Sequence, residues 1–311
     1  MPTTTPDRRS ARTEYDSVAF HSDLAARQRA RLRPAPHAPD FEQWLHEDIA
    51  ARRLEHGFIE RERERVATQA RLAPTSPDAF VEWFEGLREA GPGQGDPLFP
   101  WLAATATREE MRWFLGQEIS GEAGFDDLVA MTQVKLPARA KVEMARNYWD
   151  EMGCGHEGGM HGRLLGTLAR HFSLAGSAND ENYAAVEPCW EALALGNLMV
   201  ALATDRRLAW HSVGALGVIE LTASGRSEFV NRGLKRLDVP GEARRYFALH
   251  ATLDVKHSLL WNREVIVPLV EEFPEAAGAM AEGALMRLEA GARCFRRYRT
   301  ALWSVTAARQ S

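Results

Sequence analysis

The chain has 311 residues, of which 45% are hydrophobic and 26% are charged, and its formal net charge is −5. This length allows one large domain or two small ones with a sizeable core, and the negative charge argues against a nucleic-acid-binding surface, which would be basic. Cys154, Cys189 and Cys294 are far apart, which indicates a reducing compartment and no disulfide framework. The sequence shows neither a signal-peptide core nor a run of about 20 apolar residues, so we expect a cytoplasmic protein that has no membrane segment.

Helical periodicity of apolar residues dominates the sequence, whereas sustained period-two alternation and Asn-Gly hairpin turns are missing from it. Residues 1–14 are polar and contain Pro2 and Pro6, and we expect them to be disordered. Proline-rich breaks at 33–40 and 73–77 separate the first helices. We therefore predict an all-α fold. The expected helices cover residues 16–32, 41–71, 78–89, 107–118, 125–133, 137–151, 161–172, 183–203, 209–225, 240–271 and 273–305.

A stretch rich in Gly and Pro over residues 90–100, AGPGQGDPLFP, predicts a boundary in the chain. Before it lies a set of helices that includes a long charge run with alternating sign, which is typical of a solvated helical face. After it the pattern is helical almost throughout, as in a compact bundle. We expect an N-terminal helical extension over 1–95, with a disordered start, and a metal-binding helical domain over 96–311.

Three side chains that can bind a metal lie in ALHATLDVKHSLLW, namely His250, Asp254 and His257. Their spacings of four and three place them on a helix at roughly 0°, 40° and −20°, within one narrow stripe. A single His in such a place is best interpreted as a core residue with a hydrogen bond. The three together have the spacing with which a helix binds a first-row metal, although a solvated stripe or a hydrogen-bonded core cluster is the alternative.

A second polar stretch, residues 147–162, combines acids and histidines with four glycines between Glu151 and His161. Glu151 and His161 are ten positions apart, which would put them about 80° apart on an unbroken helix. The glycines make an unbroken helix doubtful, because they allow a bend, a left-handed residue or a close approach of another backbone. A flexible polar loop with solvated acids is the alternative. The ionisable residues of this stretch are Asp150, Glu151, His156, Glu157 and His161.

Two further carboxylates could complete such a site. Glu220 lies in the apolar run GALGVIEL, where a buried carboxylate needs a partner, either a metal or an arginine. If consecutive helices pack antiparallel, Glu220 lies across from the His250 turn. Glu118 follows an apolar helical stripe and is favoured over Glu122, with a surface acid as the alternative. Sites made of carboxylates and imidazoles without thiolates suit iron or manganese rather than structural zinc, and helical bundles of this kind commonly hold two metal ions.

The residues from about Pro97 to the C-terminus resemble the haem-oxygenase-like di-iron oxidases, a group often described as iron-containing redox enzymes. The His-x3-Asp-x2-His triad is the specific part of the resemblance, together with Glu151-x9-His161 and a later helical Glu. The resemblance implies a haem-oxygenase-like bundle of about seven helices. It implies as metal ligands Glu151, His161, Glu220, His250, Asp254 and His257, with Glu118 as the extra carboxylate of some members; Glu157 remains a rival to Glu151.

The activity implied by this resemblance is O2 activation by two non-haem iron ions, with manganese left open for one of them. The implied substrate is a small amine or an amino-acid-like or fatty-acid-like molecule, and no catalytic residue beyond the ligands is expected. No flavin or nicotinamide fingerprint is present, so electrons come from an external donor or from the substrate, and a homodimer is left open. The alternatives are a haem-binding or haem-degrading protein with His161 or His250 as proximal ligand, a non-catalytic helical protein, and a thiaminase-like hydrolase with Cys154 as nucleophile.

Overall fold

The computed structural model of the protein describes residues 15–34, 40–174 and 186–310, and every regular element within them is helical. The predicted all-α fold is confirmed, whereas the expected disorder of residues 1–14 lies outside the described residues. The helices are α2 (Val18–Leu32), α3 (Phe41–Ala70), α4 (Pro77–Ala90), α5 (Leu98–Ala104), α6 (Arg108–Ser120), α7 (Phe125–Thr132), α8 (Ala138–Glu151), α9 (His161–His171), α10 (Trp190–Thr204), α11 (Ala209–Arg236), α12 (Arg245–Trp261), α13 (Val267–Glu272) and α14 (Ala276–Gln310), with 3-10 turns η1 (Gly153–Gly155), η2 (Glu157–Gly159) and η3 (Arg206–Leu208) and a π-helical segment η4 (Asn262–Ile266).

Helix starts follow local side-chain chemistry. The carboxylate of Asp40 accepts a hydrogen bond from the backbone of Gln43 and caps α3. Thr107 and Glu110 form a reciprocal capping box at the start of α6. These caps use N–H groups that would otherwise lack a partner, so both helices begin where the sequence places polar residues before an apolar stripe.

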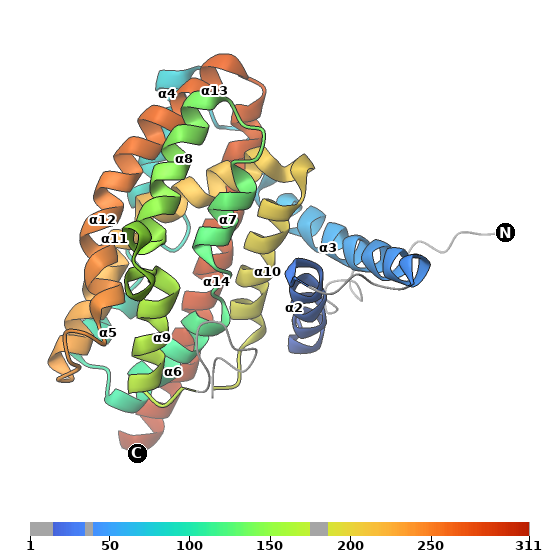
Figure 1. Ribbon diagram of the computed structural model, residues 1–311. Coiled ribbons are helices and arrows are strands. Elements are labelled where there is room, and N and C mark those ends of the chain that lie inside the picture. The colour runs from blue at the N-terminus through green and yellow to red at the C-terminus, as the bar shows by residue number, and fades with distance from the viewer. Residues whose placement is uncertain (1–14, 35–39, 175–185, 311) are drawn as a thin grey trace.

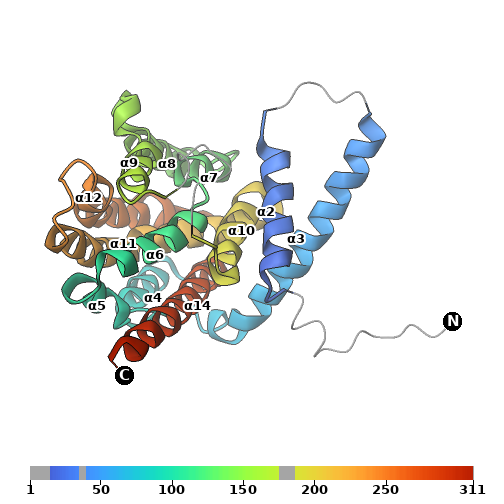
Figure 2. The same cartoon turned by 90° about the horizontal axis from the view of Figure 1, so that it is seen from below.

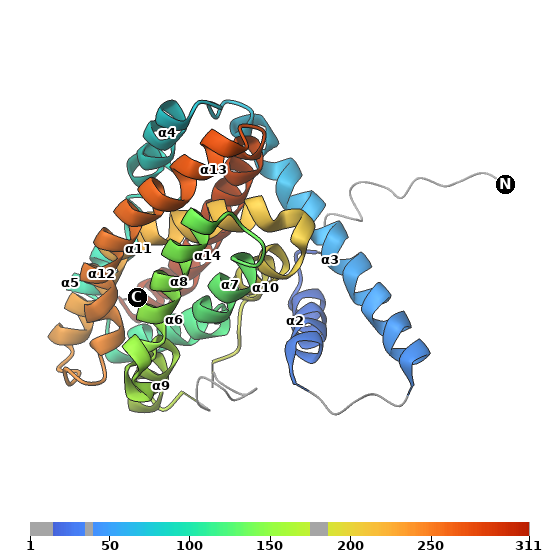
Figure 3. The same ribbon diagram turned by 45° about the horizontal axis from the view of Figure 1, so that its top comes forward.

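Helix α11 is the centre of the bundle (Figure 1). It packs against α12 on one side and α14 on another, and most of its residues are buried along the whole length. Figure 3 shows α8 lying beside α12, with α11 and α14 passing behind them. The chain thus brings three helices, α8, α11 and α12, around one polar region.

The buried apolar residues form two clusters, and the polar region lies where they meet. On α11, Leu221 belongs to the first cluster and Val230 to the second. On α12, Trp261 belongs to the first cluster and Phe247 to the second. The segment from residue 250 to 257 therefore lies between the two apolar clusters. Burial of apolar side chains in these clusters stabilises the helices on either side of the polar region.

The N-terminal helices pack onto this bundle (Figure 2). Helix α2 contacts α10, and α3 contacts α14. Leu24 of α2, Phe58 of α3 and Phe84 of α4 belong to the same apolar cluster as α11. The far end of α3 is less covered, since Phe41 is 61% exposed. The division at residue 95 stays an expectation, and the shared cluster shows that helices on both sides of it bury apolar surface together.

Several element boundaries differ from the sequence prediction. Helix α11 runs on to Arg236 instead of ending near 225, because buried Val230 and Leu234 continue its apolar face past Gly225. The short helix α5 begins within the Gly- and Pro-rich boundary, and its Leu98 is fully buried. Helix α10 begins at Trp190, residues 186–189 before it are not helical, and the expected start at 183 lies outside the described residues. The expected helix 240–271 is divided into α12, η4 and α13.

The crossing of α11 and α14 depends on two glycines that leave no room for a side chain. A Cβ on Gly214 would lie 1.9 Å from the carbonyl oxygen of Met280, and one on Gly283 would lie 1.9 Å from that of His211. Both contacts are with backbone atoms, which cannot rotate away. The two helices therefore approach as closely as backbones allow.

We expect Gly283→Ala to lower the free energy of unfolding by at least roughly 2 kcal/mol, because the helices must move apart. Gly278→Ala on the same helix is the matched control. No atom lies within 4 Å of its Cβ position, so the better helix propensity of Ala should raise stability by about 0.5–1 kcal/mol. Chemical denaturation followed by circular dichroism measures both, and equal effects of the two changes would contradict the close crossing.

Candidate metal centre

The predicted stripe on α12 is present in the structure. His250, Asp254 and His257 lie on one helix, and Asp254 and His257 are buried while His250 is half-buried. Glu220 of α11 and Glu151 at the end of α8 are also buried. Each of these polar groups has been removed from water, so each needs a partner within the protein or a bound ion.

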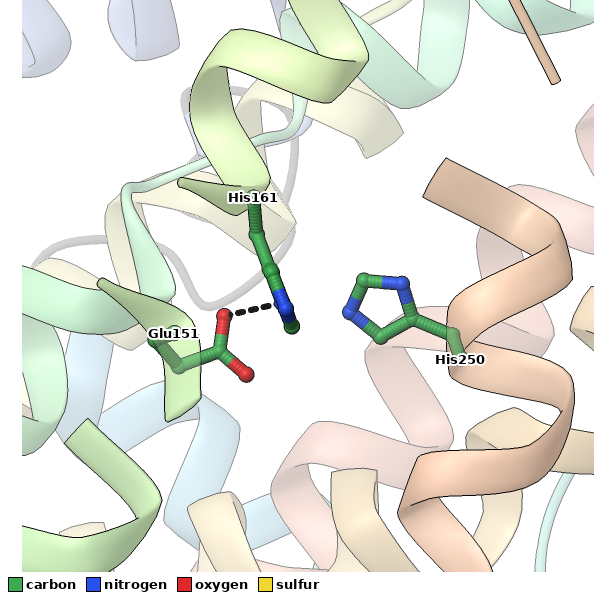
Figure 4. A group of neighbouring side chains, drawn as sticks. All are labelled: Glu151, His161 and His250. Atoms are coloured by element: carbon green, nitrogen blue, oxygen red, sulfur yellow. Dashed lines mark ion pairs between the residues drawn. The ribbon is translucent and has the colours of Figure 1, made fainter. Parts of the chain in front are cut away.

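The first cluster consists of Glu151, His161 and His250, whose metal-binding atoms all lie within 4.8 Å of one another. Figure 4 shows the carboxylate of Glu151 and the two rings turned toward one another from three different helices. The Nδ1 atom of His161 lies 2.6 Å from Oε2 of Glu151, and the rings of His161 and His250 have centroids 4.6 Å apart at 72°. Two imidazoles and one carboxylate thus converge on one point.

A glycine turn brings Glu151 and His161 together. Helix α8 ends at Glu151 and α9 begins at His161. Between them Gly153, Cys154 and Gly155 all have positive φ, and a Cβ on Gly153 would lie 2.4 Å from the carbonyl carbon of Gly159. The sequence prediction of left-handed residues and close backbone approach is confirmed here, and it explains why this stretch contains so many glycines.

The second cluster consists of Glu151, Glu220 and His257, again within 4.8 Å of one another. Oε2 of Glu220 lies 3.3 Å from Nδ1 of His257. The structure thus pairs Glu220 with His257 rather than with the His250 turn, and among the described residues no arginine forms an ion pair with it. Glu151 belongs to both clusters, so its carboxylate joins two groups of three ligands.

Two residues around the second cluster hold its ligands in place. Asn147 donates a hydrogen bond of 2.6 Å to Oε1 of Glu220, and its Nδ2 lies 3.2 Å from Nδ1 of His257. Asp150 lies 3.0 Å from Nε2 of His257. A carboxylate on the far nitrogen of an imidazole fixes the ring and makes it a better ligand. The sequence analysis did not identify Asn147 as part of the site. Its position one turn before Glu151, on the same face of α8, is the sequence feature that indicates it.

Burial makes the two histidines of the first cluster neutral. Burial, with the charge of His257 adding to it, lowers the pKa of His161 to about 4. Burial and then the neighbouring His161 lower the pKa of His250 to about 4. Nδ1 of His250 lies 2.8 Å from the carbonyl oxygen of Tyr246 and must therefore carry the proton. Its Nε2 then keeps a free lone pair, which is the form that binds a metal.

The acids of the site hold protons when no cation is bound. Burial and the charge of Glu220 raise the pKa of Glu151 well above its usual range. The same two causes raise the pKa of Asp254 to about 9. Burial lowers the pKa of His257, but its hydrogen bond to Glu220, together with Asp150, outweighs this effect and raises the pKa to about 9. Protons therefore balance the carboxylates where a cation would otherwise do so.

The described residues fit a bound metal ion. Both ring nitrogens of buried His161 lack a hydrogen-bonding partner. The short contact between Nδ1 and Glu151 does not change this, because it lacks the alignment of a hydrogen bond. A cation would take up both this lone pair and the carboxylate. The donor set of nitrogen and carboxylate oxygen, without sulfur, suits iron or manganese.

Other residues considered from the sequence lie elsewhere. Glu118 of α6 belongs to neither cluster, and Glu122 accepts hydrogen bonds from the backbone of Ala123 and Gly124. Asp254 also lies outside the two groups of three, although it is buried on the same stripe. Glu157 is exposed and forms an ion pair with Arg163 at 2.5 Å.

Cys154 has the wrong environment for a nucleophile. It is exposed, and its hydrogen bond to Asp150 raises the pKa of the thiol. A reactive cysteine needs the opposite, a lowered pKa beside a positive charge or a base. The hypothesis of a thiaminase-like hydrolase therefore lacks a suitable nucleophile at Cys154.

A comparison with protein families gives a match over residues 112–292 to the family described as iron-containing redox enzyme. The match covers more than half of the chain and includes all the residues of both clusters. The chain belongs to the iron-containing redox enzyme family. No curated protein sequence matches it closely enough to add a relative. In the part of the chain that the structure describes, no helix combines the length and apolar character needed to cross a lipid bilayer.

We expect iron(II) binding to release protons and to strengthen as pH rises, because the cation replaces protons on Glu151, Asp254 and His257. Stability of the metal-free protein should change in the opposite direction. The folded-state pKa of Asp254 is raised from 3.8 to about 9 and that of His257 from 6.5 to about 9. Both groups hold more protons when folded, so the stability that they contribute falls as pH rises, from 3.8 through about 9 for Asp254 and from 6.5 through about 9 for His257.

Anaerobic titration with iron(II) in two buffers of different protonation enthalpy measures the proton release, and thermal melts across this pH range measure the stability. The iron-loaded protein is the control, and its melting temperature should fall less. A metal-free protein that becomes more stable between these pH values, with no protons released on loading, would contradict the charge balance described above.

Proposed function

We propose that the protein is an O2-activating oxidase or oxygenase that uses two non-haem iron ions, or one iron and one manganese ion, and acts on a small amine or an amino-acid-like or fatty-acid-like substrate. One observation carries this proposal: Glu151 is shared by two groups of three ligands. A carboxylate has two oxygens, so it can serve two cations at once, as carboxylates do in bundles that hold metal pairs. Membership of an iron-containing redox family supports iron as the metal.

In this proposal each cluster holds one ion. His161 and His250 would bind the first and Glu220 and His257 the second, with Glu151 common to both. Asp254 lies on the same stripe of α12 and interacts electrostatically with Glu220 and Glu151. We propose it as a further ligand, as the resemblance implies. Glu118, which belongs to neither cluster, is not needed for this arrangement.

When bound, a reduced pair of iron ions would supply the chemistry of O2 activation. The chain supplies position and proton control. Asn147 fixes the carboxylate of Glu220, and the carbonyl of Tyr246 fixes the tautomer of His250. Asp150 accepts the proton at Nε2 of His257, which leaves Nδ1 toward the cluster. The apolar residues on both sides exclude water from the region.

The reducing electrons would come from an external donor or from the substrate, because the sequence has no flavin or nicotinamide fingerprint. A haem-binding or haem-degrading protein of the same fold is the rival proposal. It would give the buried carboxylates of Glu151 and Glu220 no metal ion and leave only protons to balance them, so the second cluster favours the di-iron assignment.

We expect the wild-type protein to bind about two iron ions per chain after anaerobic loading, and Glu151→Gln to reduce this count below one, because both clusters lose a charged ligand. His161→Ala should leave about one ion, held by the second cluster. Iron analysis of the desalted proteins measures the counts, with circular dichroism to verify folding.

The matched control is Glu157→Gln, which removes an exposed acid from the same turn and should leave the count at about two. A Glu151→Gln protein that is folded and still holds two ions would exclude a shared carboxylate, and loss of iron from Glu157→Gln would make Glu157 the ligand instead.

We expect the iron-loaded, reduced protein to consume O2 when air is admitted, with changes in its Mössbauer spectrum, and the metal-free protein to consume none. The optical spectrum should show no Soret band after expression with added haem precursor. A strong Soret band with a haem content near one per chain would support the haem-binding rival, and iron that is oxidised no faster than free iron(II) would contradict O2 activation.

A further inference from the structure

Two half-buried arginines of the bundle lack a carboxylate partner among the described residues. Arg226 is on α11 and Arg287 is on α14, and these helices pack against each other. Arg293, which is buried, forms an ion pair with Glu62, and both side chains are less than 10% exposed. Arg226 and Arg287 have no such ion pair among the described residues.

Both guanidinium groups lie around the ring of Phe295. Cζ of Arg226 is 5.7 Å from the centre of this ring. A Cβ on Gly291 would lie 3.0 Å from Nη1 of Arg287 and 3.7 Å from the Phe295 ring. The absence of a side chain at Gly291 therefore provides space for the guanidinium of Arg287 next to the ring over which Arg226 lies.

Few of the N–H donors of this pair are used. Arg226 donates one hydrogen bond, of 3.2 Å, to the hydroxyl of Thr222. Nε of Arg287 is buried and has no hydrogen-bonding partner. Within the described residues, no carboxylate oxygen lies within 4.0 Å of either guanidinium. Glu118 is the nearest compensating charge in electrostatic terms, and it is hydrogen-bonded by Tyr298.

The two half-buried arginines repel each other. Burial and then the charge of Arg287 lower the pKa of Arg226 to about 10, and burial also lowers the pKa of Arg287. Both remain charged at neutral pH. An anion beside two neighbouring cations relieves their repulsion, and planar guanidinium groups match the two oxygens of a carboxylate.

The position of the pair relates it to the metal centre. Arg226 follows Glu220 by six residues on α11, about 9 Å along the helix, and its charge interacts with that of Asp254. Tyr246 lies between the two regions. Its ring is 4.3 Å from that of His250, while its hydroxyl interacts electrostatically with Glu118 and Glu122.

We propose that Arg226 and Arg287 form an anion-binding site for the carboxylate of the substrate, which places the reacting part of the molecule toward the metal clusters. The claim that the bound molecule is the substrate rests on the proposed function. The claim that the site binds a carboxylate rests on the two arginines alone. Among small amines, amino-acid-like molecules and fatty-acid-like molecules, such a site favours those with a free carboxylate several bonds from the position that reacts.

Calorimetric titration of metal-free protein tests this site without any contribution from iron. The probes are straight-chain carboxylates from acetate to decanoate, each compared with the alcohol and the amine of the same length. At least one carboxylate should bind tenfold or more tightly than its alcohol, and the amine should not bind. Arg226→Gln and Arg287→Gln should each weaken carboxylate binding at least about tenfold, since hydrogen bonds to charged groups contribute this much or more.

Arg232→Gln is the matched control. Arg232 is on the same helix as Arg226 and also lies over an aromatic ring, with Cζ 5.6 Å from the centre of Phe229, but it is exposed. This change should leave carboxylate binding unaltered. Arg287→Lys should give an intermediate affinity, because Lys keeps the charge but not the planar fork.

Thermal melts without ligand distinguish a binding site from a structural ion cluster. Removing one of two cations that repel each other should leave the melting temperature unchanged or raise it. If the Gln variants melt several degrees earlier and bind carboxylates as the wild type does, the arginines are structural. If no carboxylate binds better than its alcohol, or if binding appears only after iron loading and ignores both substitutions, the site is excluded. Iron counts and O2 consumption test the proposed function separately.

Discussion

The crowding of buried carboxyl groups around Glu151 is the constraint on which the rest of the site depends. Glu151, Glu220 and Asp254 interact in a region without bulk water, so at most a part of their charge can exist without a cation. In the metal-free protein, protons on the acids and on His257 provide the balance. The surrounding structure keeps the crowded groups from turning away. The glycine turn fixes one end, Asn147 fixes Glu220, and the two apolar clusters close the region from either side.

Much of this arrangement could be predicted from the sequence, because it is encoded by spacing within single helices. The stripe of His250, Asp254 and His257 follows from 3.6 residues per turn, and the glycines between Glu151 and His161 predict a bend, a left-handed residue or a close approach of another backbone. The all-α fold followed from helical periodicity throughout the chain. These features depend on residues close together in the sequence, so they can be predicted without knowing how the helices pack.

Features that depend on packing between distant helices could not be predicted in this way. Glu118 has the same sequence context as a ligand, an acid after an apolar stripe, but α6 places it near Arg287 rather than in either cluster. The role of Asn147 depends on α11 and α12 both lying against α8. The full length of α11 depends on the apolar residues that cover its last turns, since Ser224 and Gly225 alone suggested an end. In each case tertiary contacts override a local preference.

Two helix ends meet at the first cluster, because Glu151 ends α8 and His161 begins α9. The backbone of both helices therefore contributes to the electrostatic potential at the site. Glu151 is the last residue of α8, where aligned peptide dipoles leave a partial negative charge of about half an elementary charge. His161 is the first residue of α9, where the partial charge is positive and opposes a proton on the imidazole. The peptide units of α8 therefore attract a cation toward the site, and those of α9 keep its ligand neutral. Both contributions belong to the main chain, so they persist whichever side chains are exchanged.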